Sequence, residues 1–221
     1  METAALQQAI TADDVARALE LVDADPALLD TPLDGGATPI LLALYLGKCG
    51  LALALAAHAR LPTAPEAAAL GDSAALLGLL SVDPAQAQAR SPDGFPALAL
   101  AVFFGHLHCA ALLLGAGADP DAPAHNPMRV TPLHAACARD DEELACALAR
   151  VLLAFAANPN VRQQAGWTPL HAAVHRDHAR LVDVLLTSGA DPGLRNDAGA
   201  DALELARAEG RERALAELQR L

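Results

Sequence analysis

The segment WTPLHAAVHRDHARLVDVLLTSGADP, residues 167–192, decides how the rest of the chain is interpreted. It places three histidines within eight positions: His171, His175 and His178. Residues four apart on a helix lie on one face, so His171 and His175 have the spacing that zinc hydrolases use for two metal ligands. Two interpretations are open at this point: the histidines form a metal site, or they belong to a structural motif.

Parts of this segment recur along the chain, which favours a repeat. Thr-Pro-Leu-His occurs at 168–171 and again at 131–134, and the weaker Thr-Pro-Ile-Leu stands at 38–41. The residue two positions before each of these motifs is followed, 11 positions later, by a second small or turn-forming residue. Five units share this register, with the paired positions Gly36 and Gly47, Gly94 and Gly105, Arg129 and Asp140, Gly166 and Asp177, and Gly199 and Gly210. Self-similarity of this kind is typical of repeat architectures.

Each part of the unit has a local physical cause. Threonine accepts a hydrogen bond from an early backbone N–H and so caps the first helix, and proline suits the first helical position. A leucine-rich segment follows and ends in a turn, as in LLLGAGADP at 112–120, VLLAFAANP at 151–159 and VLLTSGADP at 184–192. Glycine in Gly-Ala-Asp permits a left-handed C-terminal cap, and Asp-Pro starts the turn. The unit therefore predicts two short helices.

This pattern resembles the ankyrin repeat, a unit of about 33 residues made of a β-turn and two antiparallel helices. The resemblance covers nearly the whole chain and implies an all-α ankyrin-repeat solenoid of about seven helix pairs, with short β-turn or hairpin loops. We expect a single domain over 1–221 with a degenerate N-terminal repeat at 1–30, central repeats at 31–196 and a C-terminal capping repeat at 197–221. One central unit, at 65–84, is compressed.

Two units depart from the motif at the start of the first helix. In the fourth unit Pro96 occupies the threonine position, so we expect that helix to lack a hydroxyl cap. In the last unit Asp201 replaces threonine, and a carboxylate is a chemically adequate cap.

Within this register the histidines are predicted to be structural. His134 and His171 fall at the same repeat position, where the resemblance implies an imidazole that hydrogen-bonds near the capping threonine and the adjoining turn. His175 falls at the end of a first helix and His178 after the inter-helix turn, and the glutamate of an HExxH motif is absent. Cys137, close to His134, has no evident orienting acid. We therefore expect no metal, no cofactor and no catalytic residue.

Composition and charge disfavour several function classes. The formal net charge of −12 works against nucleic acids and anionic membranes, which bind clustered Lys and Arg. The apolar stretch at 40–57 has the length of a membrane span, but Lys48 at its centre, between Gly47 and Gly50, predicts two short helices. The four cysteines show no CxxC pair, which favours reduced, mostly buried thiols. The start of the chain lacks a signal-like segment, so we expect a cytoplasmic location. We also expect a monomer in isolation and no membrane partner.

In a solenoid the binding surface is predicted on the concave face, lined by hairpin tips and the ends of the first helices. Five of the six aromatic residues fall at these positions, Phe155 being the exception. Large rings and arginine are favoured anchors of protein interfaces, although rings can also pack neighbouring repeats together. The predicted protein-binding residues are Tyr45, Leu46, Phe95, Phe103, Phe104, Met128, Val130, Arg139, Trp167, His175 and Arg176.

We therefore predict a non-enzymatic module that binds a partner protein of unknown identity through this face. Two alternatives stay open: a metal- or thiol-dependent enzyme that uses the region of His171, His175 and His178 or of Cys137, and a permanent structural subunit of a larger complex. Bound metal or a cleft joining those side chains would mark the first, and an obligate, mostly apolar interface would mark the second. The Ala-, Leu-, Arg- and Pro-rich composition resembles that of GC-rich bacterial genomes.

Overall fold

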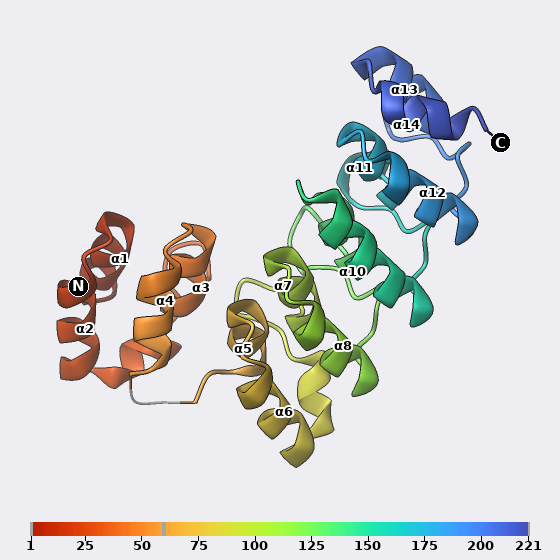
Figure 1. The fold of residues 1–221 in the computed structure, drawn as a ribbon. Coiled ribbons are helices and arrows are strands. Elements are labelled where there is room, and N and C mark those ends of the chain that lie inside the picture. Colours follow the sequence, from red (N-terminus) through yellow and green to blue (C-terminus); the bar gives the residue numbers. More distant parts are fainter. Residues whose placement is uncertain (1, 59–60, 221) are drawn as a thin grey trace.

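The computed structural model describes residues 2–58 and 61–220, and over these residues it is all-helical, with helix pairs stacked side by side (Figure 1). The first helices of the pairs form an inner row: α1 (Glu2–Ala12), α3 (Pro39–Tyr45), α5 (Ala64–Leu70), α7 (Ala97–Phe104), α9 (Pro132–Cys137), α11 (Pro169–His175) and α13 (Ala202–Glu209). The second helices form an outer row: α2 (Val15–Ala24), α4 (Cys49–Ala56), α6 (Ser73–Val82), α8 (Leu107–Gly115), α10 (Glu142–Ala154), α12 (Ala179–Thr187) and α14 (Glu212–Leu218). Three short 3₁₀-helices lie in connections: η1 (Pro26–Asp30), η2 (Pro84–Gln88) and η3 (Gln164–Gly166). The prediction of an all-α stack of seven helix pairs is confirmed.

The inner helices begin largely as their caps predict. Thr38, Thr168 and Asp201 each accept a hydrogen bond from the backbone N–H three residues ahead. The fourth unit has no side-chain cap, as expected from its proline. Thr131 differs from the prediction, because its hydroxyl lies 2.9 Å from Nδ1 of His134 and makes no capping bond to the backbone.

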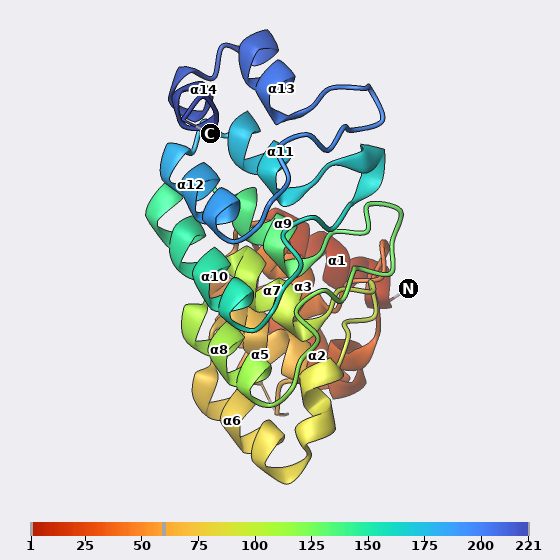
Figure 2. The ribbon, with the colours of Figure 1, turned by 90° about the vertical axis from the view of Figure 1, so that its right-hand side faces the viewer.

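Hairpins precede the later inner helices and project to the side away from the outer row (Figure 2). Neighbouring hairpins are hydrogen-bonded edge to edge through the backbone. The N–H of Gln164 donates to the carbonyl of Met128 at 3.1 Å, and the N–H of Asp197 donates to the carbonyl of Ala165 at 3.0 Å. The hairpins therefore form a continuous row rather than independent loops.

Nine of the ten turn positions predicted from the 11-residue spacing have left-handed backbone, with φ between +51° and +89°. Gly166 shows why one of them requires glycine: its φ is +69°, and an added Cβ would lie 2.5 Å from Oδ1 of Asp197 in the next hairpin. Asp140 is the exception. It follows the shortest inner helix and leads into α10, the longest outer helix.

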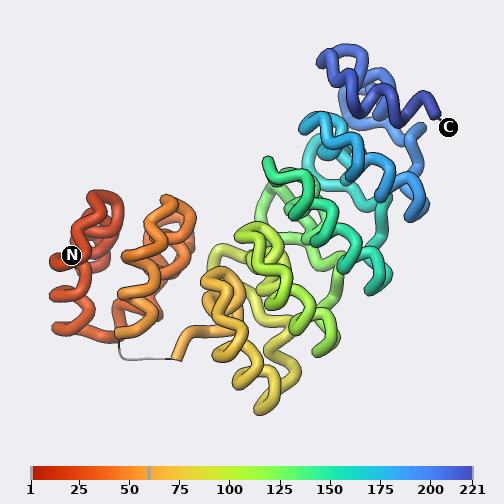
Figure 3. Tube along the Cα trace, in the orientation of Figure 1, coloured from red at the N-terminus to blue at the C-terminus, as the bar shows by residue number. Residues whose placement is uncertain are grey.

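The hydrophobic core has two parts. One is formed by α1–α4 together with Ala69 and Leu100, and the other by α5–α14. The inner row is continuous across the division, because α3 packs on α5 and α5 packs on α7. The outer row is not: α2 packs on α4, and α6 through α14 pack in order, but α4 and α6 have no comparable packing (Figures 1 and 3).

The apolar stretch at 40–57 forms α3 and α4, as predicted, with Gly47 left-handed between them. Lys48 extends back to the preceding unit, where its Nζ donates to the carbonyls of Ile10, at 2.8 Å, and Thr11. A cation is favoured there because these carbonyls end helix α1. Over the described residues, no helix is both long enough and apolar enough to cross a membrane.

Candidate functional site

The hairpins and the C-terminal ends of the inner row together form what we call the concave face. The predicted residues Tyr45, Leu46, Phe103, Phe104, Arg139, His175 and Arg176 lie at or just beyond C-terminal ends of inner helices, and Phe95, Met128, Val130 and Trp167 lie on hairpins. Most of them fall into three groups: an aromatic cluster, a charged group and a tryptophan group. Leu46 is 44% exposed and lines none of the hollows described below.

The aromatic cluster consists of Tyr45, Phe95, Phe103 and Phe104. The ring of Tyr45 stacks on Phe104 with centroids 5.9 Å apart and lies 6.4 Å from Phe95, while Phe103 and Phe104 meet edge to face at 5.1 Å. These arrangements are the ones that aromatic quadrupoles favour. The cluster joins the second unit directly to the fourth and so connects the two parts of the core on the concave face.

Members of the aromatic cluster differ in their exposure and therefore in what they offer a partner. The Tyr45 hydroxyl donates to Oδ2 of Asp93 at 2.9 Å, and burial together with that carboxylate raises the pKa of Tyr45, so the phenol stays a donor. Phe103, in contrast, is 55% exposed and borders a small apolar hollow of 50 Å³ with Val130. Tyr45 therefore holds the hairpin that contains Asp93, and Phe103 is the ring that a partner protein can reach.

The charged group lies beside Phe103. Arg139 donates to the carbonyls of Val102, at 3.3 Å, and Phe103, so it caps the C-terminal end of α7 and is in part a structural residue. Arg176 forms an ion pair with the exposed carboxylate of Asp140. Both arginines and Phe103 line one hollow of 420 Å³.

The tryptophan group is formed by Trp167, Met128 and His175. The rings of Trp167 and His175 meet edge to face with centroids 5.6 Å apart, and Nδ1 of His175 lies 2.8 Å from a carboxylate oxygen of Glu209. Met128 is 55% exposed, and it shares a shallow hollow of 220 Å³ with Trp167. This group continues the apolar surface toward the C-terminal units.

His134 and His171 are structural, as predicted. The Thr131 hydroxyl lies 2.9 Å from Nδ1 of His134, and Nε2 donates to the carbonyl of Trp167 at 3.0 Å in the next unit. His171 repeats this arrangement one unit later, with distances of 2.8 Å to the threonine hydroxyl and 3.1 Å to the next carbonyl. Burial lowers the pKa of His134 to about 4, so the ring is neutral near pH 7.

The residues considered for an enzyme do not come together. His171 is buried between two units, His175 pairs with Glu209, and His178 is the buried N-cap of α12. Over the described part of the chain, no three His, Cys, Asp or Glu side chains are placed to hold a metal ion. Burial raises the pKa of the Cys137 thiol, whereas a nucleophilic cysteine needs a lowered pKa.

Sequence reasoning missed Glu66, which takes the position of the structural histidine in the third unit. This buried carboxylate accepts from the Thr38 hydroxyl of the preceding unit at 2.7 Å, and from the Thr63 N–H at 2.9 Å and hydroxyl at 2.8 Å. The spacing of Thr63 and Glu66 is that of a capping box, which was the available signal. The contact to Thr38 could not be read from that spacing.

A second missed feature is a ladder of side chains between the Asp-Pro and Asn-Pro turns. Asp121 accepts from the N–H of Asn158 at 2.9 Å, and Asn160 accepts from the N–H of Asp191 at 2.8 Å. In the sequence these acceptors stand one residue after the proline of a turn, a pattern that is visible once the repeat is aligned. They fix the spacing of the turns on the side of the outer row.

Comparison with known proteins agrees with this architecture. A family model described as ankyrin repeats, in three copies, matches residues 65–151, 98–196 and 144–218. Similar proteins include the B-cell lymphoma 3 protein homolog of Mus musculus, 34% identical over 55% of this chain and 26% of that protein. The nuclear factor NF-kappa-B p105 subunit of Gallus gallus is 35% identical over 59% of this chain and 13% of its own length. The E3 ubiquitin-protein ligase KEG of Arabidopsis thaliana is 38% identical over 43% of this chain, which spans only 6% of that ligase.

Proposed function

The chain belongs to the ankyrin-repeat family, and from that premise we propose that it is a non-enzymatic module that binds a partner protein through its concave face. The observation that carries the proposal is the aromatic cluster with Phe103 at its exposed end. A large, half-exposed ring beside apolar and charged hollows is the kind of anchor that contributes most to protein interfaces.

The chemistry of the face indicates the chemistry of the partner. The hollow beside Phe103 and Val130 suits a small apolar side chain, and the adjacent hollow offers both guanidinium groups and the carboxylate of Asp140. A partner segment that carries an apolar residue next to polar or charged residues would match these two hollows. Charge complementarity sets the approach and orientation of such a partner more than its affinity.

We infer further that the chain acts as a cytoplasmic monomer. Buried reduced thiols at Cys109, Cys137 and Cys146 fit a reducing compartment. The ligase activity named for one relative is not carried over, since this chain spans only 6% of that protein. The alternative of a permanent subunit differs from the proposal in the reversibility of the complex and is tested with it.

Site-specific photocrosslinking in the source organism tests this proposal. The photoreactive residue p-benzoylphenylalanine replaces Phe103, and in a matched variant it replaces Phe155. Phe155 is a suitable control because it is also a phenylalanine and is 45% exposed, against 55% for Phe103, but lies at the end of outer helix α10. We expect a discrete adduct with one protein from position 103 and none with that protein from position 155.

The same partner should dissociate and rebind when the purified complex is diluted, as a reversible interface requires. Equal adducts from both positions, or an adduct from position 155 alone, would contradict binding through the concave face. A complex that never dissociates would instead support the permanent subunit.

A further inference from the structure

The outer row is interrupted at one place. α6 packs on α8, and the following outer helices continue in order to α14. On its other side α6 has no such neighbour, because α4 belongs to the N-terminal part of the core and stands apart from it (Figure 1). One side of α6 is therefore uncovered by the outer row.

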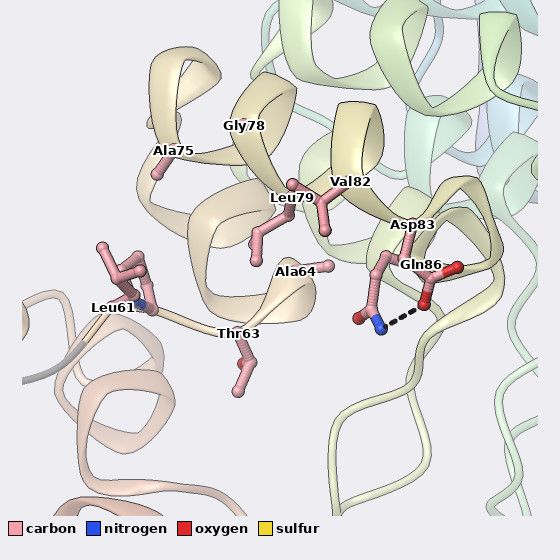
Figure 4. Close-up of a pocket in the computed structure, with 10 residues that line it drawn as sticks. Leu61, Thr63, Ala64, Ala75, Gly78, Leu79, Val82, Asp83 and Gln86 are labelled. Carbon is pink, nitrogen blue, oxygen red and sulfur yellow. Dashed lines mark hydrogen bonds between the residues drawn. The ribbon is translucent and has the colours of Figure 1, made fainter.

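An apolar groove runs along that side of α6. We call it the α6 groove. Its floor is a stripe of residues with the spacing i, i+3, i+4 and i+7, namely Ala75, Gly78, Leu79 and Val82 (Figure 4). It has a volume of 710 Å³. Leu61 borders it and is 81% exposed, and Val82 is 89% exposed. Two large apolar side chains are thus exposed beside one apolar hollow.

The register of α6 shows what normally fills such a groove. Counted from the helix caps, Ala75 and Leu79 correspond to Leu181 and Leu185 of α12. Both leucines of α12 are fully buried in the stack, where α12 packs on α10. The corresponding residues of α6 are only half-buried. The α6 groove thus occupies the position that elsewhere receives the preceding outer helix.

We propose that the α6 groove binds an amphipathic α-helix of a partner protein, which packs along α6 as an additional member of the outer row. Helices pack by setting ridges of side chains into grooves, and the small Ala75 and Gly78 leave room for such a ridge. The ten residues of α6 extend over roughly 15 Å, so the contact takes about three turns of the partner helix.

The charge around the groove specifies the flanks of that helix. Asp72 and Asp83, the two caps of α6, are both exposed, so a carboxylate stands at each end of the stripe. The residues that line the groove include no lysine or arginine within the described part of the chain. The matching partner carries a leucine-type stripe flanked by basic residues. This surface is separate from the concave face, so the inference stands apart from the proposed function.

A synthetic peptide tests the inference with the whole chain. The probe is a fluorescein-labelled peptide of about four helical turns, with leucines at i, i+3, i+4 and i+7 and lysines beside them. Its control is an isomeric peptide with the same composition and the leucines spread around the helix. We expect fluorescence anisotropy to show saturable binding of the first peptide, and affinity lower by roughly tenfold or more for the isomer.

Two matched variants of the protein locate the binding. Gly78→Leu fills the α6 groove, and Gly115→Leu makes the same change on α8; an added Cβ meets open space at both positions, so both variants should fold. We expect Gly78→Leu to weaken peptide binding by roughly tenfold and Gly115→Leu to change it by less than about twofold. Circular dichroism and thermal melting confirm that both are folded.

Analytical sedimentation of the protein without peptide shows whether a second copy of the chain occupies the groove, because the protein would then be a dimer. Absence of binding, equal binding of both peptides, or equal effects of the two variants would overturn the proposal. A dimer that Gly78→Leu dissociates would assign the groove to a second copy of the chain and overturn it as well. A monomer that binds only the striped peptide, and only when residue 78 is small, supports it.

Discussion

The units from α9 to α13 and the junction from α3 to α7 show two ways of joining repeats. Between α9 and α13 each unit is tied to the next by a backbone bond between hairpins, a histidine that reaches the next carbonyl and packing of the outer helices. At the junction the ties lie on the inner side. They are the aromatic cluster and the bond from Thr38 to Glu66, while the outer side is open at the α6 groove.

The difference teaches that the inner row alone can keep a solenoid continuous. Where large apolar residues stand at the outer positions, as in α12, the stack closes on both sides. Where Ala75 and Gly78 stand instead, the inner row still packs but the outer row does not. Since neighbour contacts dominate the stability of repeat proteins, the two parts of the core should respond separately to local damage.

The strongest way to test this comparison is to make a cavity on each side of the junction. Leu51 of α4 and Leu113 of α8 are equally buried, one in each part of the core. Each substitution by alanine is expected to destabilise its own part by about 2–5 kcal/mol. In hydrogen exchange measured by mass spectrometry, Leu51→Ala should raise exchange in α1–α4 and leave α9–α14 protected, and Leu113→Ala should do the reverse. Uniform exchange in both variants would mean that the core unfolds as one unit.

A smaller effect is expected from the inner-side tie itself. Glu66→Ala removes the acceptor of Thr38 and Thr63 inside the stack, which should lower the free energy of unfolding by about 2–3 kcal/mol, because buried donors left without an acceptor are costly. Glu204→Ala is the matched control: it also removes the glutamate of a capping box, but at an exposed site in the last unit. Because that site is open to water, its loss of stability should be much smaller than that of Glu66→Ala. Urea denaturation measures the free energy of unfolding of both variants. Equal losses would mean that Glu66 does not tie the units together at the junction.

The repeat could be predicted from the sequence because its signals are local. A cap, a proline and a left-handed turn each act within a few residues, so the helix pairs and nine of the ten turn positions follow from spacing alone. The same holds for the placement of the predicted binding residues at hairpins and helix ends. The spacing could not show that Asp140 alone among these positions is not left-handed, because it lies 11 residues after Arg129 as in the other pairs.

The junction could not be predicted because its contacts join units that are far apart in the sequence. Tyr45 meets Phe95 and Phe104 across a whole intervening unit, and Thr38 meets Glu66 only because the third unit carries glutamate where others carry histidine. Spacing also could not tell which rings pack and which are exposed. That distinction depends on the neighbours of each ring: Phe103 is exposed, whereas the half-buried Tyr45 is held by its hydrogen bond to Asp93.

The smallest expected effect is a dependence of the free energy of unfolding on pH, which tests the histidine ties of the units from α9 to α13. Because burial lowers the pKa of His134 from 6.5 to about 4 in the folded chain, folding favours the neutral ring. A histidine of this kind contributes fully above the unfolded pKa, and its contribution is lost as the pH falls from about 6.5 toward about 4. Between pH 7 and pH 5 the free energy of unfolding should therefore fall by about 2 kcal/mol on account of this residue.

His134→Gln should lower stability at pH 7 and flatten this dependence, because glutamine has no proton to gain. His108→Gln, which replaces an exposed histidine on α8, is the matched control for the substitution itself. Urea denaturation at the two pH values gives both results. If His134→Gln keeps the full pH dependence, the histidine ties do not distinguish the continuous units from the junction, and the loss on acidification must come from groups shared by both.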